Sequence, residues 1–129
     1  MDYPEERFDE LMAINVKGPL GLRAAVPALR KRGGGSVIIT SSVAGIKGAP
    51  SLAPYVTSKH AVIGLMKSAA KEFAAEGIRV NTVNPSPVNT RMMRSIEHGL
   101  NPDQPEQAQQ MMAAAFPCSV TQRPRTLPI

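Results

Sequence analysis

The middle of the chain contains the feature that most constrains its fold, a strand, a long helix and a second strand in succession. A β-branched run at 36–41, preceded by three glycines, predicts a buried strand. The segment 53–76 is rich in Ala, Lys and Glu and predicts a helix that Gly77 ends, and 78–83 predicts the second strand. Two strands joined by one helix form a right-handed crossover, so they are expected to be parallel. A parallel pair of strands buried on both faces is not a complete sheet, so the sequence predicts part of an α/β domain.

Helices are predicted on both sides of this unit. A first helix extends from Pro4 to Val16, with apolar residues at helical spacing. Gly18-Pro19 is expected to interrupt or kink it, because proline has no N–H and its ring crowds the preceding turn. Helical sequence resumes over 20–29 and ends before Gly33-Gly34-Gly35. From Thr90 to Ala115 the sequence predicts polar helices and no further strand.

The composition excludes several classes of protein. The 129 residues suffice for one domain, and 43% apolar with 19% charged residues is typical of a globular chain. No segment approaches the roughly 20 apolar residues of a membrane-spanning helix, and the acidic N-terminus is unlike a secretory signal. Cys118 is the only cysteine, which excludes an internal disulfide and a cysteine metal site. We therefore expect a cytoplasmic protein without a metal centre.

The net charge of +5 raises the question of nucleic-acid binding. Residues 11–71 contain no Asp or Glu and many Lys and Arg, but Tyr55 is the only aromatic residue among them. Nucleic-acid binding surfaces commonly combine basic side chains with several aromatic ones. We therefore interpret the basic span as solvated helix faces whose acidic partners lie elsewhere, and expect no nucleic-acid partner.

Three polar residues occupy informative positions in and beside the predicted crossover. Ser42 directly follows the first strand, at the carboxyl end where open α/β sheets bind ligands. Tyr55 and Lys59 are four residues apart, on one face of the long helix. Taken singly, a Tyr-x3-Lys pair is usually a surface contact and a serine after a strand is usually part of a loop. Together, the Ser-x12-Tyr-x3-Lys pattern resembles the active site of the short-chain dehydrogenase/reductase family.

Further segments extend this resemblance over residues 4–117. They occur in the family's order: Ile14-Asn15-Val16-Lys17-Gly18, Ser41–Gly45, Tyr55–Ala61, Gly77–Asn81 and Pro85–Thr90. The resemblance implies a partial doubly wound, Rossmann-like parallel sheet. It also implies NAD or NADP as the cofactor, a small-molecule alcohol or ketone as the substrate, and homo-oligomerisation of the intact family member.

The predicted catalytic residues are Asn15, Ser42, Tyr55 and Lys59. A free tyrosine has a pKa of about 10, which is high for proton exchange near neutral pH. A cation one turn away favours the phenolate, so Tyr55 is expected to act as acid or base while Ser42 hydrogen-bonds the reacting oxygen. The resemblance implies that Lys59 also binds the nicotinamide ribose and that Asn15 positions a water in a proton relay. An alternative role for Asn15 is to satisfy backbone groups at the Gly18-Pro19 kink.

The resemblance also assigns residues to the cofactor. They are Tyr55, Lys59, Pro85, Ser86, Val88 and Thr90. Ser86 departs from the family's Pro-Gly pair, and glycine is the residue that permits close backbone approach to a ligand. The family's glycine-rich phosphate turn follows a strand, whereas Gly33-Gly34-Gly35 precedes one and is interpreted as an ordinary turn.

The sequence therefore predicts a fragment. Residues 1–117 are the catalytic part, without the N-terminal nucleotide-binding half; 91–117 are the substrate lid, and 118–129 are a disordered tail that does not match the family. We expect an NAD(P)-dependent oxidoreductase that is inactive in this form. The alternative is a non-catalytic interaction or oligomerisation module derived from the family, whose long helices pair with an intact relative.

Overall fold

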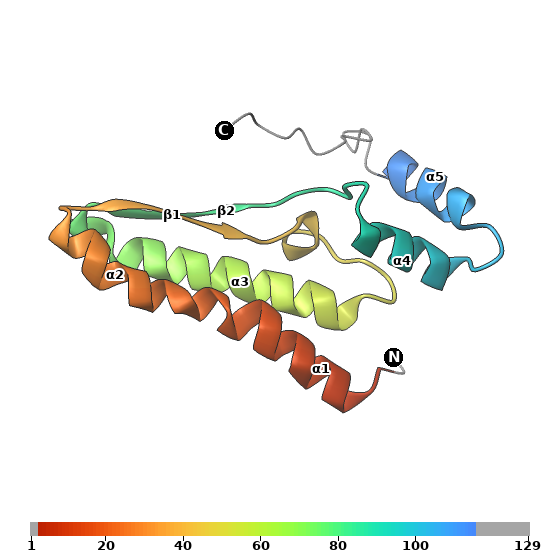
Figure 1. The fold of residues 1–129 in the computed structure, drawn as a ribbon, viewed down its shortest axis with the longest axis horizontal. Helices are drawn as coiled ribbons and strands as arrows, with labels where there is room; N and C mark the ends of the chain where they lie inside the picture. The colour runs from red at the N-terminus through yellow and green to blue at the C-terminus, as the bar shows by residue number, and fades with distance from the viewer. Residues whose placement is uncertain (1–2, 116–129) are drawn as a thin grey trace. The chain divides into compact units, whose positions relative to one another are not determined.

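The computed structural model describes residues 3–115. Its sheet has two strands, β1 (Gly35–Thr40) and β2 (Ile78–Val83), which are parallel and pair in register from Gly35 opposite Ile78 to Thr40 opposite Val83. The helix α3 (Ala53–Glu72) connects them (Figure 1). The predicted parallel crossover is confirmed.

The N-terminal helix is broken over a longer stretch than the sequence predicts. The α-helix α1 (Glu5–Met12) passes into a π-helical segment, Ala13–Lys17, and a 3₁₀ turn, Pro19–Gly21, before α2 (Leu22–Lys31) begins. Pro19 explains the break, because it has no N–H to donate to the carbonyl group four residues earlier and its ring crowds that group. A π-helical turn is a common way to absorb such a disruption.

The long helix is also shorter than predicted at its C-terminal end. The α-helix ends at Glu72, and a 3₁₀ turn, Ala74–Glu76, continues to Gly77. Gly77 has a left-handed backbone with φ of +69°, which ends the helix and favours glycine. Gly33 and Gly34, which precede β1, lie close to this position, and a Cβ added to Gly34 would lie 2.6 Å from the carbonyl oxygen of Gly77. The predicted turn is therefore observed at Gly33 and Gly34, which both have positive φ, whereas Gly35 is already the first residue of β1.

The hydrophobic core lies between one face of the sheet and the helices α2 and α3 (Figure 1). Alternate side chains of both strands point into it. The buried members of this core are Val26, Ile39, Val62, Ala69, Phe73, Ile78 and Val80.

The other face of the sheet is exposed, so the prediction of a strand buried on both faces is wrong. Ile38 is 65% exposed and Val83 is 45% exposed. Ser36, Thr40 and Arg79 point to the same face and are also exposed. The reason is that helices of the described residues cover only one side of the two strands.

One member of the basic span finds an acidic partner outside that span. Arg30, at the end of α2, forms two hydrogen bonds to the carboxylate of Glu76 and lies 5.9 Å from the centre of the Phe73 ring. The hydrogen bonds from Arg30 lower the pKa of the Glu76 carboxyl group. This pair connects α2 to the turn that follows α3.

The chain divides into two compact units, Met1–Asn84 and Pro85–Ile129. The second unit contains the helices that the sequence predicts, α4 (Arg91–Leu100) and α5 (Pro105–Ala115), and the two pack against each other. Asn101 begins the turn between them, and its side chain accepts a hydrogen bond from the backbone N–H of Gln104 at 3.2 Å. The predicted lid, 91–117, falls within this unit, and the predicted tail, 118–129, lies outside the described residues.

Between residues 3 and 115, no helix combines the length and apolar character that crossing a membrane requires.

Candidate active site

All four predicted catalytic residues belong to the first unit. Asn15 lies in the π-helical segment, Ser42 lies just beyond the carboxyl end of β1, and Tyr55 and Lys59 lie in the first turns of α3. The helix α3 packs against the loop that contains Ser42, and it also packs against the π-helical segment. The fold thus connects three separate parts of the sequence through a single helix.

Lys59 links α3 to the end of the first strand. Its ammonium nitrogen lies 5.6 Å from the centre of the Tyr55 ring and donates to the backbone carbonyl of Thr40, the last residue of β1, at 3.4 Å. The side chain is half-buried, and this desolvation lowers the pKa of the Lys59 ammonium group. A cation therefore stands beside the Tyr55 ring, as the spacing predicts.

The stability of the chain is expected to depend on pH through Lys59. Its pKa in the folded chain lies below the ordinary lysine value of 10.5. Between that lowered pKa and 10.5 the unfolded chain binds more protons than the folded chain, so the free energy of unfolding rises with pH. Urea unfolding at a series of pH values should show a steeper rise in this window for the native sequence than for Lys59→Met.

Lys67→Met is the matched control for this effect, because Lys67 is an exposed lysine on the same helix. This control should leave the pH dependence of the urea midpoint unchanged. Equal slopes for the native chain and Lys59→Met would show that the Lys59 ammonium group is not desolvated.

Ser42 has a structural role in the loop that follows β1. It caps the 3₁₀ turn Val43–Gly45, where its hydroxyl oxygen accepts a hydrogen bond from the backbone N–H of Ala44 at 3.2 Å. A serine hydroxyl has one proton to donate and two lone pairs to accept with. The cap uses one lone pair, so the proton can still be donated to a substrate oxygen.

Sequence reasoning missed two residues that hold this loop on α3. The Ser41 hydroxyl is buried and donates to the backbone carbonyl of Lys59 at 3.0 Å. Gly45 lets the backbone of this loop lie close to α3, because a Cβ added at Gly45 would lie 2.7 Å from the Ser41 hydroxyl oxygen and 2.8 Å from the Lys59 carbonyl oxygen. The signal was the run of small residues after β1, Ser41-Ser42-Val43-Ala44-Gly45, whose packing partner was not evident from the sequence.

The side chain of Asn15 bonds to α3 and not to the helix break. Its amide nitrogen donates to the hydroxyl oxygen of Ser58 at 3.1 Å. The alternative in which this side chain satisfies backbone groups at Gly18-Pro19 is therefore wrong. The bond links Asn15 to the part of α3 that contains the other two predicted catalytic residues of that helix, because Ser58 lies between Tyr55 and Lys59.

The remaining cofactor candidates belong to the second unit. Thr90 caps α4, where its hydroxyl oxygen accepts from the backbone N–H of Met93 at 3.4 Å. Ser86 and Val88 are partly buried, and Pro85 is exposed. Their contact with a cofactor stays a prediction.

The carboxyl end of β2 has an acceptor without a partner. The side-chain nitrogen of Asn84 donates to the Thr82 hydroxyl at 3.2 Å, but its side-chain oxygen is buried and has no hydrogen-bond partner among the described residues. Buried acceptors are normally satisfied. This oxygen can accept a hydrogen bond at the edge where parallel sheets bind ligands.

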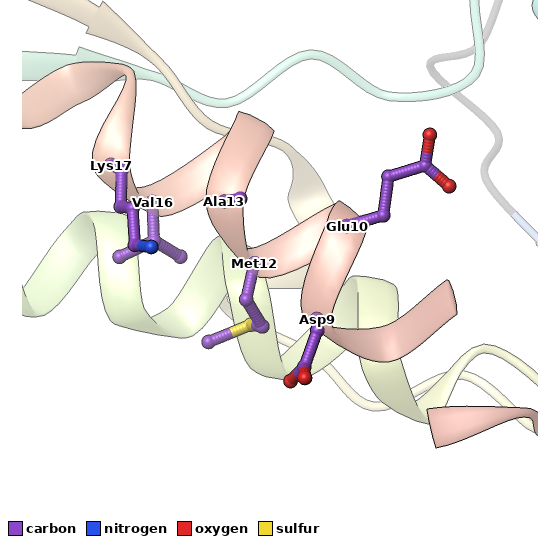
Figure 2. A pocket seen from close by; sticks show the side chains of 6 residues that line it. All are labelled: Asp9, Glu10, Met12, Ala13, Val16 and Lys17. Atoms are coloured by element: carbon purple, nitrogen blue, oxygen red, sulfur yellow. The ribbon is translucent and has the colours of Figure 1, made fainter. Parts of the chain in front are cut away.

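A surface hollow of about 630 Å³ lies along the first helical stretch of the chain. Figure 2 shows that its lining comes from one helical stretch, α1 and the π-helical segment that follows: Asp9, Glu10, Met12, Ala13, Val16 and Lys17. None of the predicted catalytic residues lines it. We therefore place the candidate site at the carboxyl end of β1 and not in this hollow.

Comparison with known proteins finds similarity to dehydrogenases and reductases. Residues 1–101 match the family model described as short chain dehydrogenase. The chain is 48% identical over 92 residues to dehydrogenase/reductase SDR family member 4 of Mus musculus, covering 70% of this chain and 33% of that protein. It is 42% identical over 119 residues to oxidoreductase UcpA of Salmonella typhimurium, covering 91% of this chain and 45% of that protein.

Solved structures agree with this result. The structure of levodione reductase matches with a TM-score of 0.86 and 32% identity, over 92% of this chain and 46% of that one. Xylitol dehydrogenase matches with a TM-score of 0.83 and 31% identity, over 92% of this chain and 49% of that one. The chain thus spans a third to a half of the length of these relatives, whose Rossmann folds contain its α/β arrangement. The order of motifs, the fold and the family model agree, and the chain belongs to the short-chain dehydrogenase/reductase family.

Proposed function

We propose that this chain carries the catalytic residues of an NAD(P)-dependent oxidoreductase that moves hydride between nicotinamide and an alcohol or ketone, with Tyr55 as the acid or base. The observation that supports this most directly is the position of the Lys59 ammonium group, 5.6 Å from the Tyr55 ring and in contact with the carboxyl end of β1. Ser42 begins the loop at that same end of the strand. The phenol of Tyr55, the ammonium group of Lys59 and the hydroxyl of Ser42 are the kinds of group that proton exchange with an alcohol oxygen requires.

Each side chain has a separate task in the proposed reaction. The Tyr55 phenol gives a proton to the carbonyl oxygen of a ketone or takes one from an alcohol. The Ser42 hydroxyl, with its proton free beyond the cap on Ala44, hydrogen-bonds that oxygen and holds it in place. The Lys59 ammonium group, 5.6 Å from the centre of the Tyr55 ring, can stabilise negative charge that develops on the phenol oxygen during proton transfer. The nicotinamide cofactor, when bound, supplies or receives the hydride.

The helix break supports the proposed role of Asn15 in a proton relay. In a regular α-helix, the residue at 19 would donate its N–H to the carbonyl of residue 15. Proline has no N–H, so Pro19 cannot make this bond. We propose that the Asn15 backbone carbonyl positions a water that returns protons through Lys59.

The cofactor follows from the relatives. One matching structure is of xylitol dehydrogenase bound to NAD+, another is of carveol dehydrogenase with NAD, and a third is of L-sorbose reductase with NADPH and L-sorbose. In the first unit, the half-buried ammonium group of Lys59 is the candidate donor to the nicotinamide ribose. In the second unit, the family resemblance assigns Val88 and Thr90 to the carboxamide, and Pro85 and Ser86 to the cofactor in general. NAD and NADP are both retained as candidates.

The pyrophosphate end of the cofactor lacks a counterpart in this sequence. The family resemblance implies that the pyrophosphate binds at a glycine-rich turn between a strand and the N-terminus of a helix. Gly33 and Gly34 instead precede β1 and lie close to Gly77, and Gly35 is the first residue of β1. We propose that the chain corresponds to the catalytic, C-terminal part of a family member and has little or no activity by itself.

A chimera tests the catalytic assignment separately from the proposed inactivity of the isolated chain. The chain is fused behind the part of UcpA from Salmonella typhimurium that precedes the matched region, and NAD(P)H oxidation is measured with a panel of small ketones. Tyr55→Phe in the chimera should lower kcat by about 10²–10⁴-fold, the usual contribution of general acid–base catalysis. Tyr3→Phe is the control, because Tyr3 is the only other tyrosine and is exposed.

The two parts of the proposal have separate outcomes. NAD(P)H oxidation by the isolated chain above that of its Tyr55→Phe variant would contradict the inactivity of the isolated chain. A Tyr55→Phe chimera with unchanged kcat would contradict the role of Tyr55.

Exposed apolar side chains favour an interaction module as the second candidate. Ile14 is 66% exposed and Leu20 is 42% exposed, both on the helical side of the first unit. In this function the helices pair with an intact relative or with a second copy, as homo-oligomerisation in the family suggests. The purified chain is run on size exclusion alone and together with intact UcpA. Co-elution with UcpA that Ile14→Asp abolishes would favour this function, and elution of the chain as a monomer in both runs would exclude it.

A further inference from the structure

Ser58 is a polar residue with no exposed surface, on the face of α3 that meets the π-helical segment. A buried hydroxyl group destabilises a fold unless its hydrogen-bonding capacity is used. Here it is used twice. The hydroxyl donates to the backbone carbonyl of Tyr55 at 2.7 Å and accepts from the amide nitrogen of Asn15 at 3.1 Å.

The direction of these bonds determines the orientation of the Asn15 side chain. A carbonyl oxygen only accepts, so the hydroxyl proton of Ser58 must point to Tyr55. The hydroxyl oxygen then presents a lone pair to Asn15, which only the NH₂ group of the amide can use. The amide nitrogen of Asn15 therefore faces Ser58, and its side-chain oxygen faces the other way.

We infer that Ser58 is a positioning residue, whose hydroxyl ties the Asn15 side chain to the turn of α3 that carries Tyr55 and Lys59. The catalytic meaning of this inference rests on the proposed function, whereas the hydrogen bonds themselves do not depend on it. The bond joins the broken part of the first helix to the helix that holds the reacting phenol. Catalytic groups need to be held within about 0.5 Å of their productive geometry by such supporting contacts.

Alanine at position 58 would remove the anchor and leave the backbone of α3 intact. Alanine has the higher helix propensity of the two residues, so α3 itself is not weakened. The amide of Asn15 would then lose its acceptor and rotate freely about its side-chain torsions. Ser68→Ala is the matched control, because Ser68 is exposed on the same helix and makes no side-chain hydrogen bond among the described residues.

The test is the side-chain NH₂ signal of Asn15 in the full 129-residue chain, labelled with ¹⁵N at asparagine and assigned through its loss in Asn15→Ala. In the native sequence this amide should exchange its protons more slowly than the exposed amides of Asn81 and Asn89. Ser58→Ala should move the signal toward those of the exposed amides. It should also raise the exchange rate about fivefold, as the loss of one ordinary hydrogen bond predicts. Ser68→Ala should leave both the position and the rate unchanged.

Each result decides the inference without an activity assay. A residue that only fills the core would lower the free energy of unfolding in Ser58→Ala and leave the Asn15 amide protected, which would overturn the positioning role. Should Ser58→Ala fail to fold, the native chain still decides, because an Asn15 amide that exchanges as fast as those of Asn81 and Asn89 also overturns it. The two proposals can also fail separately. If the Asn15 amide exchanges slowly and this depends on Ser58, but Tyr55→Phe leaves kcat of the chimera unchanged, the proposed function is rejected and the hydrogen bond between Ser58 and Asn15 is retained.

Discussion

Replacement of Ile78 by alanine is expected to lower the free energy of unfolding by about 2–5 kcal/mol. Ile78 begins β2 and is 1% exposed, and it belongs to the core cluster with Val62 and Val80. Removing its side chain loses the transfer of apolar surface out of water and leaves a cavity that the surrounding helices fill only in part. Urea unfolding followed by circular dichroism measures the change.

Ile38→Ala is the matched control for this prediction. It removes the same atoms from the neighbouring strand, but Ile38 is 65% exposed on the uncovered face of the sheet. The free energy of unfolding should change by no more than about 0.5 kcal/mol. Equal losses in the two variants would show that the face with Ile38 is also covered in solution, and would contradict the arrangement of helices on one side only.

Gly45→Ala is expected to destabilise the chain by about 1–3 kcal/mol and to displace the loop of Ser42 from α3. Gly45 is buried, and an added Cβ would lie within 2.7–2.9 Å of the Ser41 hydroxyl oxygen, the Lys59 carbonyl oxygen and a methyl carbon of Ile63. Two of these neighbours are held by the hydrogen bond between Ser41 and Lys59, so the loop and not the helix must shift. The measurement combines urea unfolding with amide chemical shifts of the first turns of α3.

Gly64→Ala makes the same change inside α3, with the opposite expected effect on the free energy of unfolding. No atom lies within 4 Å of a Cβ added at this position. Alanine in a helix interior is more favourable than glycine by about 0.5–1 kcal/mol, so the free energy of unfolding should increase. A Gly45→Ala variant as stable as the native chain would contradict the close contact between the loop and α3.

The crossover was predictable because local sequence determines both its periodicity and its ends. The β-branched run before Ser42 and the residues from Ile78 to Val83 match strands within one residue of their observed bounds. Gly77 was the strongest local signal, since the observed φ of +69° is the conformation that glycine adopts without a steric cost. Helix bounds were less accurate, because the break at Pro19 extends back to Ala13 through a π-helical segment that side-chain periodicity does not specify.

The candidate site was predictable to a similar degree. The spacing of Tyr55 and Lys59 places them on one face of a helix whatever that helix packs against. The partners of Asn15 and Lys59 were not predictable, because Ser58 and Thr40 lie far from them in sequence and only packing brings their atoms together. Gly45 likewise acquires its importance from the approach of α3.

The sequence alone therefore determined the order of the elements and the parallel direction of the strands, since both follow from local propensity and connection. It also supplied the side chains proposed to react, through the resemblance of their motifs to the short-chain dehydrogenase/reductase family. Only the tertiary structure decided which face of the sheet is covered and which hydrogen bonds the site residues make. An alternating strand has two faces, and neither is the buried one until helices pack on it. The exposure of Ile38 and the complete burial of Ser58 depend on that packing and not on their neighbours in the sequence.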